Sequence, residues 1–363
     1  MNVCFLLGGF SGTGGIGRVT SILANEICKS EGYKVHTLSF YNNQKEKNYV
    51  LDLRIKQDYL FQKPINMTKG ILNGGISKLR KYLLNNDIDI LVACGALYYP
   101  ITILSSIGTK TKTICWEHSN VRNSKDHSYQ LLSRRIGAKK ANKVVTLTKH
   151  DQKMYLEKYR NNNVIQIYNP IDEEIFKYIK KYKADSKKII SVGRFSYQKN
   201  FELLIDIANN VLHKNRDWTW DIYGDGELRN TLETKIKEYK LENQLFLKGS
   251  VNNLYKHYPD YAFLVMTSRY EGFPMSLLEG MAHGLPLISF DVLTGPNEII
   301  RNGDNGFLIE SFDKQQMISN ISFLIDNQEE RIKMSYFSKE ICEQYKINEI
   351  VNQWKSLFEE ILI

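Results

Sequence analysis

Short apolar or β-branched runs alternate with amphipathic stretches of helical periodicity along nearly the whole sequence. The spacing fits βαβ units, because parallel strands need a crossover long enough to hold a helix. Strands are expected over residues 3–7, 34–39, 88–94, 111–116, 143–148 and 163–168, and then over 188–192, 219–223, 244–248, 262–267, 287–291 and 306–309. This alternation predicts an α/β protein with two doubly wound parallel sheets.

The two series of strands are separated by residues 169–187, where Pro170 precedes a run rich in Lys and Tyr with little apolar periodicity. A chain of 363 residues also exceeds the size at which one hydrophobic core stops growing. We therefore predict an N-terminal Rossmann-like domain over 1–168, a linker over 169–187 and a C-terminal Rossmann-like domain over 188–346. The final amphipathic stretch, about 347–363, is predicted to be a helix that can pack back on the first domain.

The composition is that of a globular protein, with 42% hydrophobic and 25% charged residues. The first residues indicate a buried strand and not a signal peptide, and no apolar run reaches transmembrane length. Five widely spaced cysteines, with no C-x-x-C pair, indicate reduced thiols. These features predict a cytoplasmic protein.

Charge is unevenly distributed: residues 1–168 hold 25 Lys and Arg against 11 Asp and Glu, a net +14, which leaves −5 for the rest of the +9 chain. Basic clusters at Lys78, Arg80 and Lys81, and at Arg134, Arg135, Lys139, Lys140 and Lys143, lie on or beside predicted helices. They could form a solvated face, or contact an anionic membrane as peripheral anchors. Nucleic acid is not an expected partner, because no helix-turn-helix, RNP or zinc-finger pattern accompanies the charge.

The first strand is followed by a glycine-rich turn, in which Gly12, Gly14 and Gly17 satisfy G-x-G-x-x-G. Such a turn can bring backbone N–H groups to a phosphate, or can serve only close packing. A nicotinamide-dependent oxidoreductase would also need a carboxylate at the end of the second strand, and residues 37–41 contain none. That class is therefore disfavoured. A non-catalytic protein that binds through its basic surface is disfavoured for another reason, because the carboxylate pair Glu271 and Glu279 is expected at a sheet edge.

Two loops of the second half carry charged side chains directly after predicted strands. Arg194 and Lys199 follow the strand at 188–192, and Glu271 and Glu279 follow the strand at 262–267. Because ligands bind at the carboxyl edge of a parallel sheet, the two cations are candidates for neutralising a diphosphate. Pro274 suits the first turn of a helix, whose free N–H groups would favour the same anion.

Together these motifs resemble the retaining family 4 glycosyltransferases of GT-B fold: the E-x7-E pair Glu271 and Glu279, the loop with Gly193, Arg194 and Lys199, and the glycine-rich first turn. Residues 289–300 and 305–307 resemble the branch that builds bacterial O-antigens, capsules and exopolysaccharides. The chain departs from the common pattern at Asn200, where glycine is frequent, and at Thr294-Gly295-Pro296, which replaces a double glycine.

The resemblance implies a role for each matching residue. Glu271 would bond the donor sugar, Glu279 the ribose, and Arg194 and Lys199 the diphosphate, while His118 would contact donor sugar or acceptor. The catalytic residues would be Glu271, His118, Arg194 and Lys199. The donor site would comprise Gly14, Gly15, Gly193, Arg194, Lys199, Gly249, Ser250, Val251, Glu271, Gly272, Phe273, Pro274, Met275, Ser276, Leu277 and Glu279.

The implied reaction is retaining transfer of a sugar from a nucleotide-sugar, expected to be a UDP-hexose or UDP-N-acetylhexosamine, with GDP-mannose as the alternative. The acceptor would be a glycan or a polyprenyl-diphosphate-linked sugar, on the inner face of the cytoplasmic membrane. Protein cations and helix N–H groups can stabilise the leaving diphosphate, so neither a metal nor another cofactor is expected. The pair Asp87 and Asp89 precedes a predicted strand and is interpreted as a structural cap.

Overall fold

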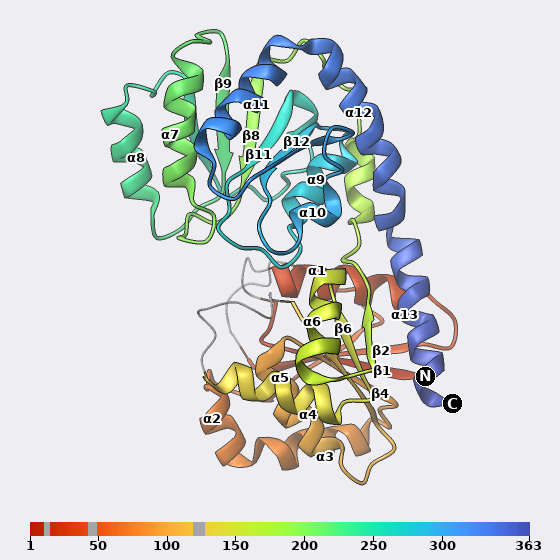
Figure 1. Cartoon of the computed structure of the whole chain (residues 1–363). Helices are drawn as coiled ribbons and strands as arrows, with labels where there is room; N and C mark the ends of the chain where they lie inside the picture. Colours follow the sequence, from red (N-terminus) through yellow and green to blue (C-terminus); the bar gives the residue numbers. More distant parts are fainter. Residues whose placement is uncertain (11–14, 43–48, 119–127) are drawn as a thin grey trace. The chain divides into compact units, whose positions relative to one another are not determined.

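The structure is a computed structural model that describes the chain except for residues 11–14, 43–48 and 119–127. It divides into two compact units (Figure 1). Unit 1 comprises Met1–Pro170 and Ile347–Ile363, and unit 2 comprises Ile171–Lys346. Each unit is built around its own parallel sheet.

Unit 1 contains, in its described residues, a seven-stranded sheet of order β3-β2-β1-β4-β5-β6-β7, in which every pairing is parallel. Its strands are β1 (Asn2–Leu7), β2 (Lys34–Tyr41), β3 (Lys56–Phe61), β4 (Ile90–Cys94), β5 (Lys112–Trp116), β6 (Lys143–Thr146) and β7 (Val164–Gln166). The order reverses between β1 and β4, whose side chains are almost entirely buried because helices cover both faces.

The helices of unit 1 form two layers (Figure 1). They are α1 (Gly15–Ile27), α2 (Met67–Gly70), η1 (Ile71–Gly75), α3 (Ile76–Asn85), η2 (Ala96–Tyr98), α4 (Tyr99–Ser106), α5 (Ser128–Lys140), α6 (Lys149–Tyr159) and α13 (Ile347–Leu362). Helices α3, α4, α5 and α6 pack side by side in one row, and α1 packs against α13. The C-terminal helix thus lies in unit 1, although it is far from that unit in sequence.

Unit 2 contains a six-stranded parallel sheet of order β10-β9-β8-β11-β12-β13 in its described residues. Its strands are β8 (Lys188–Val192), β9 (Thr219–Tyr223), β10 (Leu245–Gly249), β11 (Phe263–Met266), β12 (Leu287–Phe290) and β13 (Gly306–Ile309). Its helices are η3 (Glu173–Tyr178), α7 (Phe201–Leu212), α8 (Arg229–Glu238), η4 (Tyr258–Asp260), α9 (Met275–Ala282), α10 (Pro296–Ile299), α11 (Lys314–Asp326), α12 (Gln328–Cys342) and η5 (Glu343–Tyr345). One apolar cluster fills the interior between this sheet and α7, α8 and α11.

The predicted α/β class with two doubly wound sheets is confirmed, and each of the twelve predicted strands lies within two residues of an observed one at either end. One strand was not predicted. β3 lies at the edge of its sheet and is mostly exposed or half-buried, so its residues show no apolar alternation.

The segment predicted as a linker differs from that expectation. Most of it packs against unit 2, where the Tyr182 hydroxyl donates to Ala262 O at 2.6 Å and Ser186 Oγ to Asp260 O at 2.7 Å. Tyr255 likewise donates to Asp172 Oδ2 at 2.9 Å. Tyrosine hydroxyls therefore anchor a stretch that lacks apolar periodicity.

No helix in the described part of the chain is long and apolar enough to cross a membrane. All five cysteines are buried and unpaired. Asp87 and Asp89 both form ion pairs with Lys110 at 2.7 Å, and Asp89 Oδ2 accepts from Asn2 N–H. These carboxylates lie at the amino edge of the sheet. Their contacts agree with the interpretation of the pair as a structural cap.

Candidate active site

Three neighbouring strands of unit 2 end in glycines that lie against one another. Gly224 N–H donates to Gly249 O at 3.0 Å, and Gly193 N–H donates to Tyr223 O at 2.9 Å. A Cβ on Gly224 would stand 1.9 Å from Gly193 O, so no side chain fits between these turns. The carboxyl edge of β8, β9 and β10 therefore carries no side chain at these turns, so that a bound nucleotide could approach the backbone. Gly224 was missed in the sequence analysis.

Gly193 also makes room for Lys199. A Cβ at Gly193 would meet Cγ and Cδ of Lys199 at 3.0 Å, so the lysine stem lies over the bare backbone. Lys199 Nζ then donates to Glu271 Oε1 at 2.6 Å. The structure thus brings together a cation and a carboxylate predicted from two separate loops, 72 residues apart.

Hydrogen bonds to backbone carbonyls tie these two loops together. Arg269 N–H donates to Gln198 O at 2.8 Å, Gln198 Nε2 donates to Tyr270 O at 3.0 Å, and Thr267 Oγ1 donates to Lys199 O at 3.2 Å. Asn200 follows Lys199 in the left-handed conformation, with φ of 56°. Asparagine tolerates that conformation better than other side chains, which explains why it can stand where glycine is frequent.

Glu271 is 6% exposed and precedes the start of α9. Pro274 is the N-cap residue and supplies no side-chain capping bond, and no acidic side chain occupies the first turn. Of the motif residues, Phe273, Pro274, Ser276 and Leu277 are buried, and Gly272 and Met275 are half-buried. This helix start favours an anion, because its N–H groups carry partial positive charge.

Three buried side-chain oxygens at the same edge have no hydrogen-bond partner among the described residues: Ser276 Oγ, Ser268 Oγ and Asn200 Oδ1. Buried polar atoms are nearly always paired, so a cluster of exceptions calls for a ligand or ordered water. Ser268 lies two residues after β11, Asn200 is the N-cap residue of α7, and Ser276 is the second residue of α9. Their grouping marks a polar site there.

The loop after β12 packs against the backbone of the loop that contains Glu271. The sequence did not predict this contact. Thr294 is fully buried, and its hydroxyl donates to Glu271 O at 2.6 Å. Gly295 has φ of 97°, and a Cβ there would lie 2.7 Å from Pro274 Cδ and 2.9 Å from Gly272 O. The departure from a double glycine therefore adds a hydroxyl that fixes the Glu271 backbone.

Glu279 occupies the second turn of α9 and is 3% exposed. The hydroxyl of the fully buried Tyr258 donates to its Oε2 at 2.7 Å. The Tyr258 ring stacks on His283, with centroids 5.1 Å apart. Burial lowers the pKa of His283 from 6.5 to about 4, so this imidazole is neutral at physiological pH.

The remaining predicted donor residues of unit 2 lie at the exposed rim. The Arg194 side chain is 70% exposed and forms an ion pair with Glu227 at 3.2 Å. Ser250 and Val251 are exposed directly after β10, and Gly249 has φ of 74°. Because exposed ion pairs are weak, Arg194 can exchange Glu227 for another anion at small cost.

The glycine-rich turn of unit 1 is described in part. Gly15 begins α1 and has open space around it, whereas Gly14 lies outside the described residues. A Cβ at Gly17 would crowd Gly9 O and Tyr49 at 3.3 Å. Gly17 therefore serves close packing of α1 on the turn, whereas Gly15 has room for a ligand.

His118 follows β5, at the carboxyl edge of unit 1's sheet. Its ring lies against Trp116, with centroids 4.2 Å apart and ring planes tilted by 49°, and its Nε2 has no hydrogen-bond partner in the described part of the chain. Burial lowers the pKa of His118 to about 3. The side chain is thus a neutral imidazole with one open nitrogen, suited to hydrogen bonding and not to carrying charge.

The structure corrects the prediction for the basic cluster that contains Arg134 and Lys143. Arg134 is fully buried, with Nε donating to Glu117 Oε2 at 2.7 Å, and the Tyr155 hydroxyl donates to the same oxygen at 3.0 Å. Lys143 is paired with Glu360 at 2.7 Å. The expectation that Arg134 reaches a membrane is wrong, because a buried carboxylate beside the sheet needs that guanidinium.

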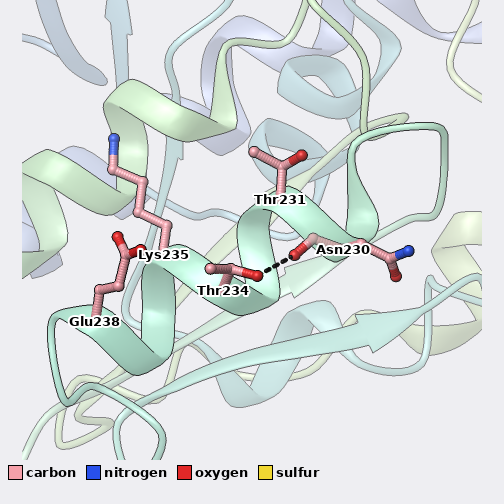
Figure 2. Close-up of a pocket in the computed structure, with 5 residues that line it drawn as sticks. All are labelled: Asn230, Thr231, Thr234, Lys235 and Glu238. Atoms are coloured by element: carbon pink, nitrogen blue, oxygen red, sulfur yellow. Dashed lines mark hydrogen bonds between the residues drawn. The ribbon is translucent and has the colours of Figure 1, made fainter.

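A separate hollow lies over α8, lined by Asn230, Thr231, Thr234, Lys235 and Glu238 (Figure 2). All five residues belong to one helix, and Thr234 Oγ1 donates to Asn230 O within it. Lys235 is already paired with Asp206 at 2.8 Å. Because its lining comes from one helix and two of its polar groups, Thr234 Oγ1 and Lys235 Nζ, are already paired, this hollow is a weaker candidate site than the sheet edge.

Comparison with known proteins agrees with this geometry. Residues 172–341, which hold Lys199, Glu271 and Glu279, match the family described as glycosyl transferases group 1. An uncharacterized glycosyltransferase of Haemophilus influenzae is 27% identical over 353 residues, covering 97% of this chain and 98% of that protein. The amylovoran biosynthesis glycosyltransferase AmsD of Erwinia amylovora is 29% identical, with 97% and 98% covered.

A third relative, from Campylobacter jejuni, is 24% identical and covers 99% of both chains; it is named GalNAc-alpha-(1->4)-GalNAc-alpha-(1->3)-diNAcBac-PP-undecaprenol alpha-1,4-N-acetyl-D-galactosaminyltransferase. Among solved structures, S. aureus TarM in complex with UDP matches with a TM-score of 0.82 at 18% identity, covering 99% of this chain and all of that one. Anabaena HepE in complex with UDP matches with a TM-score of 0.83 at 16% identity, with the same coverage.

The class of protein follows from fold and site together: two Rossmann-like domains with parallel sheets, in the GT-B fold. Within that class, residues 172–341 of this chain carry a glycosyltransferase group 1 domain.

Proposed function

We propose that this protein is a retaining glycosyltransferase of family 4 that transfers a hexose or N-acetylhexosamine from a UDP-sugar to a glycan or polyprenyl-diphosphate-linked acceptor in bacterial surface polysaccharide synthesis. One observation carries the proposal: the nearly buried Glu271 is paired with Lys199 directly before the start of α9. A carboxylate for sugar hydroxyls and two sources of positive charge for a diphosphate thus lie at one sheet edge.

The chemistry needs charge to be stabilised on the departing diphosphate. Lys199 Nζ has three N–H donors and spends one on Glu271, which leaves donors for phosphate oxygens. The first N–H groups of α9, and the unpartnered Ser276 Oγ, supply further contacts at the same place. Glu271, held at its backbone by Thr294, would orient the donor sugar through its hydroxyls.

The choice of UDP is supported by two structural neighbours, TarM and HepE, whose structures were solved in complex with UDP. The acceptor class is supported by the names of relatives, one for amylovoran biosynthesis and one with a PP-undecaprenol-linked substrate. A lipid-linked acceptor would place this enzyme in the cytoplasm at the inner face of the membrane, in peripheral contact with anionic lipid.

The test is a panel of UDP-, GDP-, ADP- and dTDP-sugars, assayed by thermal shift and by slow donor hydrolysis. A ligand that binds only the folded protein raises its unfolding temperature, and we expect UDP-sugars to give the largest shift. Hydrolysis should persist in EDTA, because protein cations and helix N–H groups meet the diphosphate charge. A larger shift with GDP-mannose would overturn the donor, and activity restored only by a divalent metal would overturn the metal-free mechanism.

A further inference from the structure

The helices from α2 to α5 in one layer of unit 1 carry positive charge only, whereas α6 at the end of the same row also holds Asp151 and Glu157. Helices α2 to α5, with η1 and η2, cover residues 67–85, 96–106 and 128–140, and these ranges contain eight Lys and Arg but no Asp or Glu. Seven of the eight cations lie outside the core, since Arg134 is the buried one. The opposite layer differs, because α1 and α13 together hold four Glu against one Arg and one Lys.

The same layer exposes large apolar side chains. Leu97, Leu104, Ile107, Leu131 and Leu132 are between 41% and 62% exposed. Single exposed leucines are ordinary on soluble proteins, but a group of five over adjoining helices marks an interaction surface.

Contacts among the helices show that the elements carrying these exposed side chains are packed against one another. Ser105 Oγ of α4 donates to Ile76 O of α3 at 3.1 Å, and Arg80 of α3 donates to Ile107 O beyond the end of α4. The Tyr129 hydroxyl of α5 donates to Leu97 O of η2 at 3.2 Å. The row formed by α3, α4 and α5 lies along one side of the sheet (Figure 1).

Five exposed cations of this layer have no ion-pair partner in the described ranges, although Lys78 Nζ already lies over the Phe61 ring, 4.3 Å from its centroid. Lys78, Lys81, Arg135, Lys139 and Lys140 form no ion pair with any residue that the structure describes. In contrast, Lys143 beyond α5 is paired with Glu360. A surface that combines unpaired cations with exposed leucines complements anionic headgroups above an acyl layer, whereas a protein partner would have to be both acidic and apolar.

We propose that the face formed by Leu97, Leu104, Ile107, Leu131 and Leu132 with the five unpaired cations, here called the leucine-cation face, docks on an anionic phospholipid bilayer. The leucines enter the headgroup region and the long cationic side chains reach the phosphates. The inference deepens the proposed function, on which it rests for a lipid-linked acceptor. It excludes the buried Arg134 and keeps Arg135, Lys139 and Lys140, which the structure exposes.

Vesicle co-sedimentation tests the face with the full chain and no sugar donor. Vesicles of phosphatidylcholine with one third phosphatidylglycerol should bind the protein at low salt, and binding should fade as NaCl is raised, because salt screens exposed charges. Pure phosphatidylcholine vesicles should bind much less. Equal binding to both vesicles, or none to either, overturns the proposal.

Two variants separate charge from apolar contact. Arg135→Gln with Lys139→Gln and Lys140→Gln should weaken binding about a hundredfold, since each cation near an anionic surface contributes about fivefold. Leu104→Gln with Ile107→Gln and Leu132→Gln should weaken it by at least about tenfold and leave some salt-sensitive binding. Circular dichroism and thermal melting should show both variants folded.

Matched controls lie in unit 2. Phe323→Gln with Ile332→Gln and Tyr336→Gln removes three similarly exposed apolar side chains, and Lys214→Gln with Lys237→Gln and Lys256→Gln removes three exposed cations. If these weaken vesicle binding as much as the face variants do, the leucine-cation face is not the docking site. Hydrolysis of the UDP-sugar should be unchanged in all four variants, so a wrong face and a wrong enzymatic function give different results.

Discussion

Glu271 shows how a single residue can be identified by type from the sequence while its surroundings cannot. Its place after a buried strand and before a proline-initiated helix predicted a loop carboxylate at the sheet edge. The pairing with Lys199 was not predictable, because it depends on Gly193 letting the lysine stem cross the backbone. A nearly buried carboxylate is costly without such a partner, so the pair acts as one unit.

Replacing Lys199, which is a member of this pair, should therefore affect activity more than replacing the exposed Arg194. Lys199→Gln leaves Glu271 without its cation and should lower turnover at least about a hundredfold, since a charge-assisted contact contributes about 1.5–3 kcal/mol and Glu271 is displaced as well. Arg194→Gln, at an exposed rim, should mainly raise the KM for donor. Steady-state kinetics with the correct UDP-sugar distinguish the two, and equal small effects would remove Lys199 from the site.

Thr294 gives a second test at this scale. Thr294→Val keeps the shape but removes the bond to Glu271 O, leaving a buried carbonyl unpaired, and should lower kcat about tenfold. Thr294→Ser retains the hydroxyl and should restore most of the activity. Calorimetry with UDP should show little change in either variant. A kcat loss in Thr294→Ser as large as that in Thr294→Val would mean that the hydroxyl is not what positions Glu271.

At the scale of elements, the strands were predictable because buried parallel strands are continuous apolar runs, and the edge strand β3 was not because it is mostly solvent-facing. The start of α9 was predictable from Pro274. The contacts of Tyr258 with this helix were not predictable. Tyr258 lies in η4, and no pattern in the sequence joins it to Glu279 or His283. Side-chain networks between elements depend on packing that local periodicity does not encode.

The buried His283 predicts a pH dependence of stability. Its pKa is lowered from 6.5 to about 4 by burial, so between these values the unfolded chain binds a proton that the folded protein does not. Stability contributed by the neutral ring is fully present above pH 6.5 and is lost as pH falls toward 4. Between pH 7 and pH 5 the free energy of unfolding should fall by roughly 2 kcal/mol from this residue alone.

His283→Phe keeps an aromatic ring against Tyr258 and removes the titration. Urea unfolding of both proteins at pH 7 and pH 5 should show a smaller loss of stability in the variant. An equal loss in the two proteins would show that His283 is protonated in the folded state or that other groups dominate this range.

At the scale of the whole molecule, the two sheets were predictable from the restart of the strand pattern, and the chemistry of unit 1's surface was not. The sequence shows where cations cluster but not which of them is buried, so Arg134 was placed on the membrane side although it balances Glu117 inside the unit. The sequence predicted only that the last helix can pack on unit 1. An amphipathic pattern shows that a helix packs against some surface, but it does not show which one.

The packing of α13 in unit 1 predicts how the two units unfold. Trp354 of α13 is fully buried in unit 1 and packs edge-on against Trp116 at 4.9 Å, whereas Trp218 is buried in unit 2 beside Phe263 at 5.8 Å. Removing a buried tryptophan costs about 3–5 kcal/mol in the unit that holds it. If the nucleotide binds unit 2, UDP should protect that unit alone from urea. Trp354→Ala should then lower the midpoint of the transition that UDP does not protect, and Trp218→Ala the midpoint of the one that it does. A loss of the UDP-protected transition in Trp354→Ala would mean that α13 stabilises the nucleotide-binding unit and not the unit against which it packs.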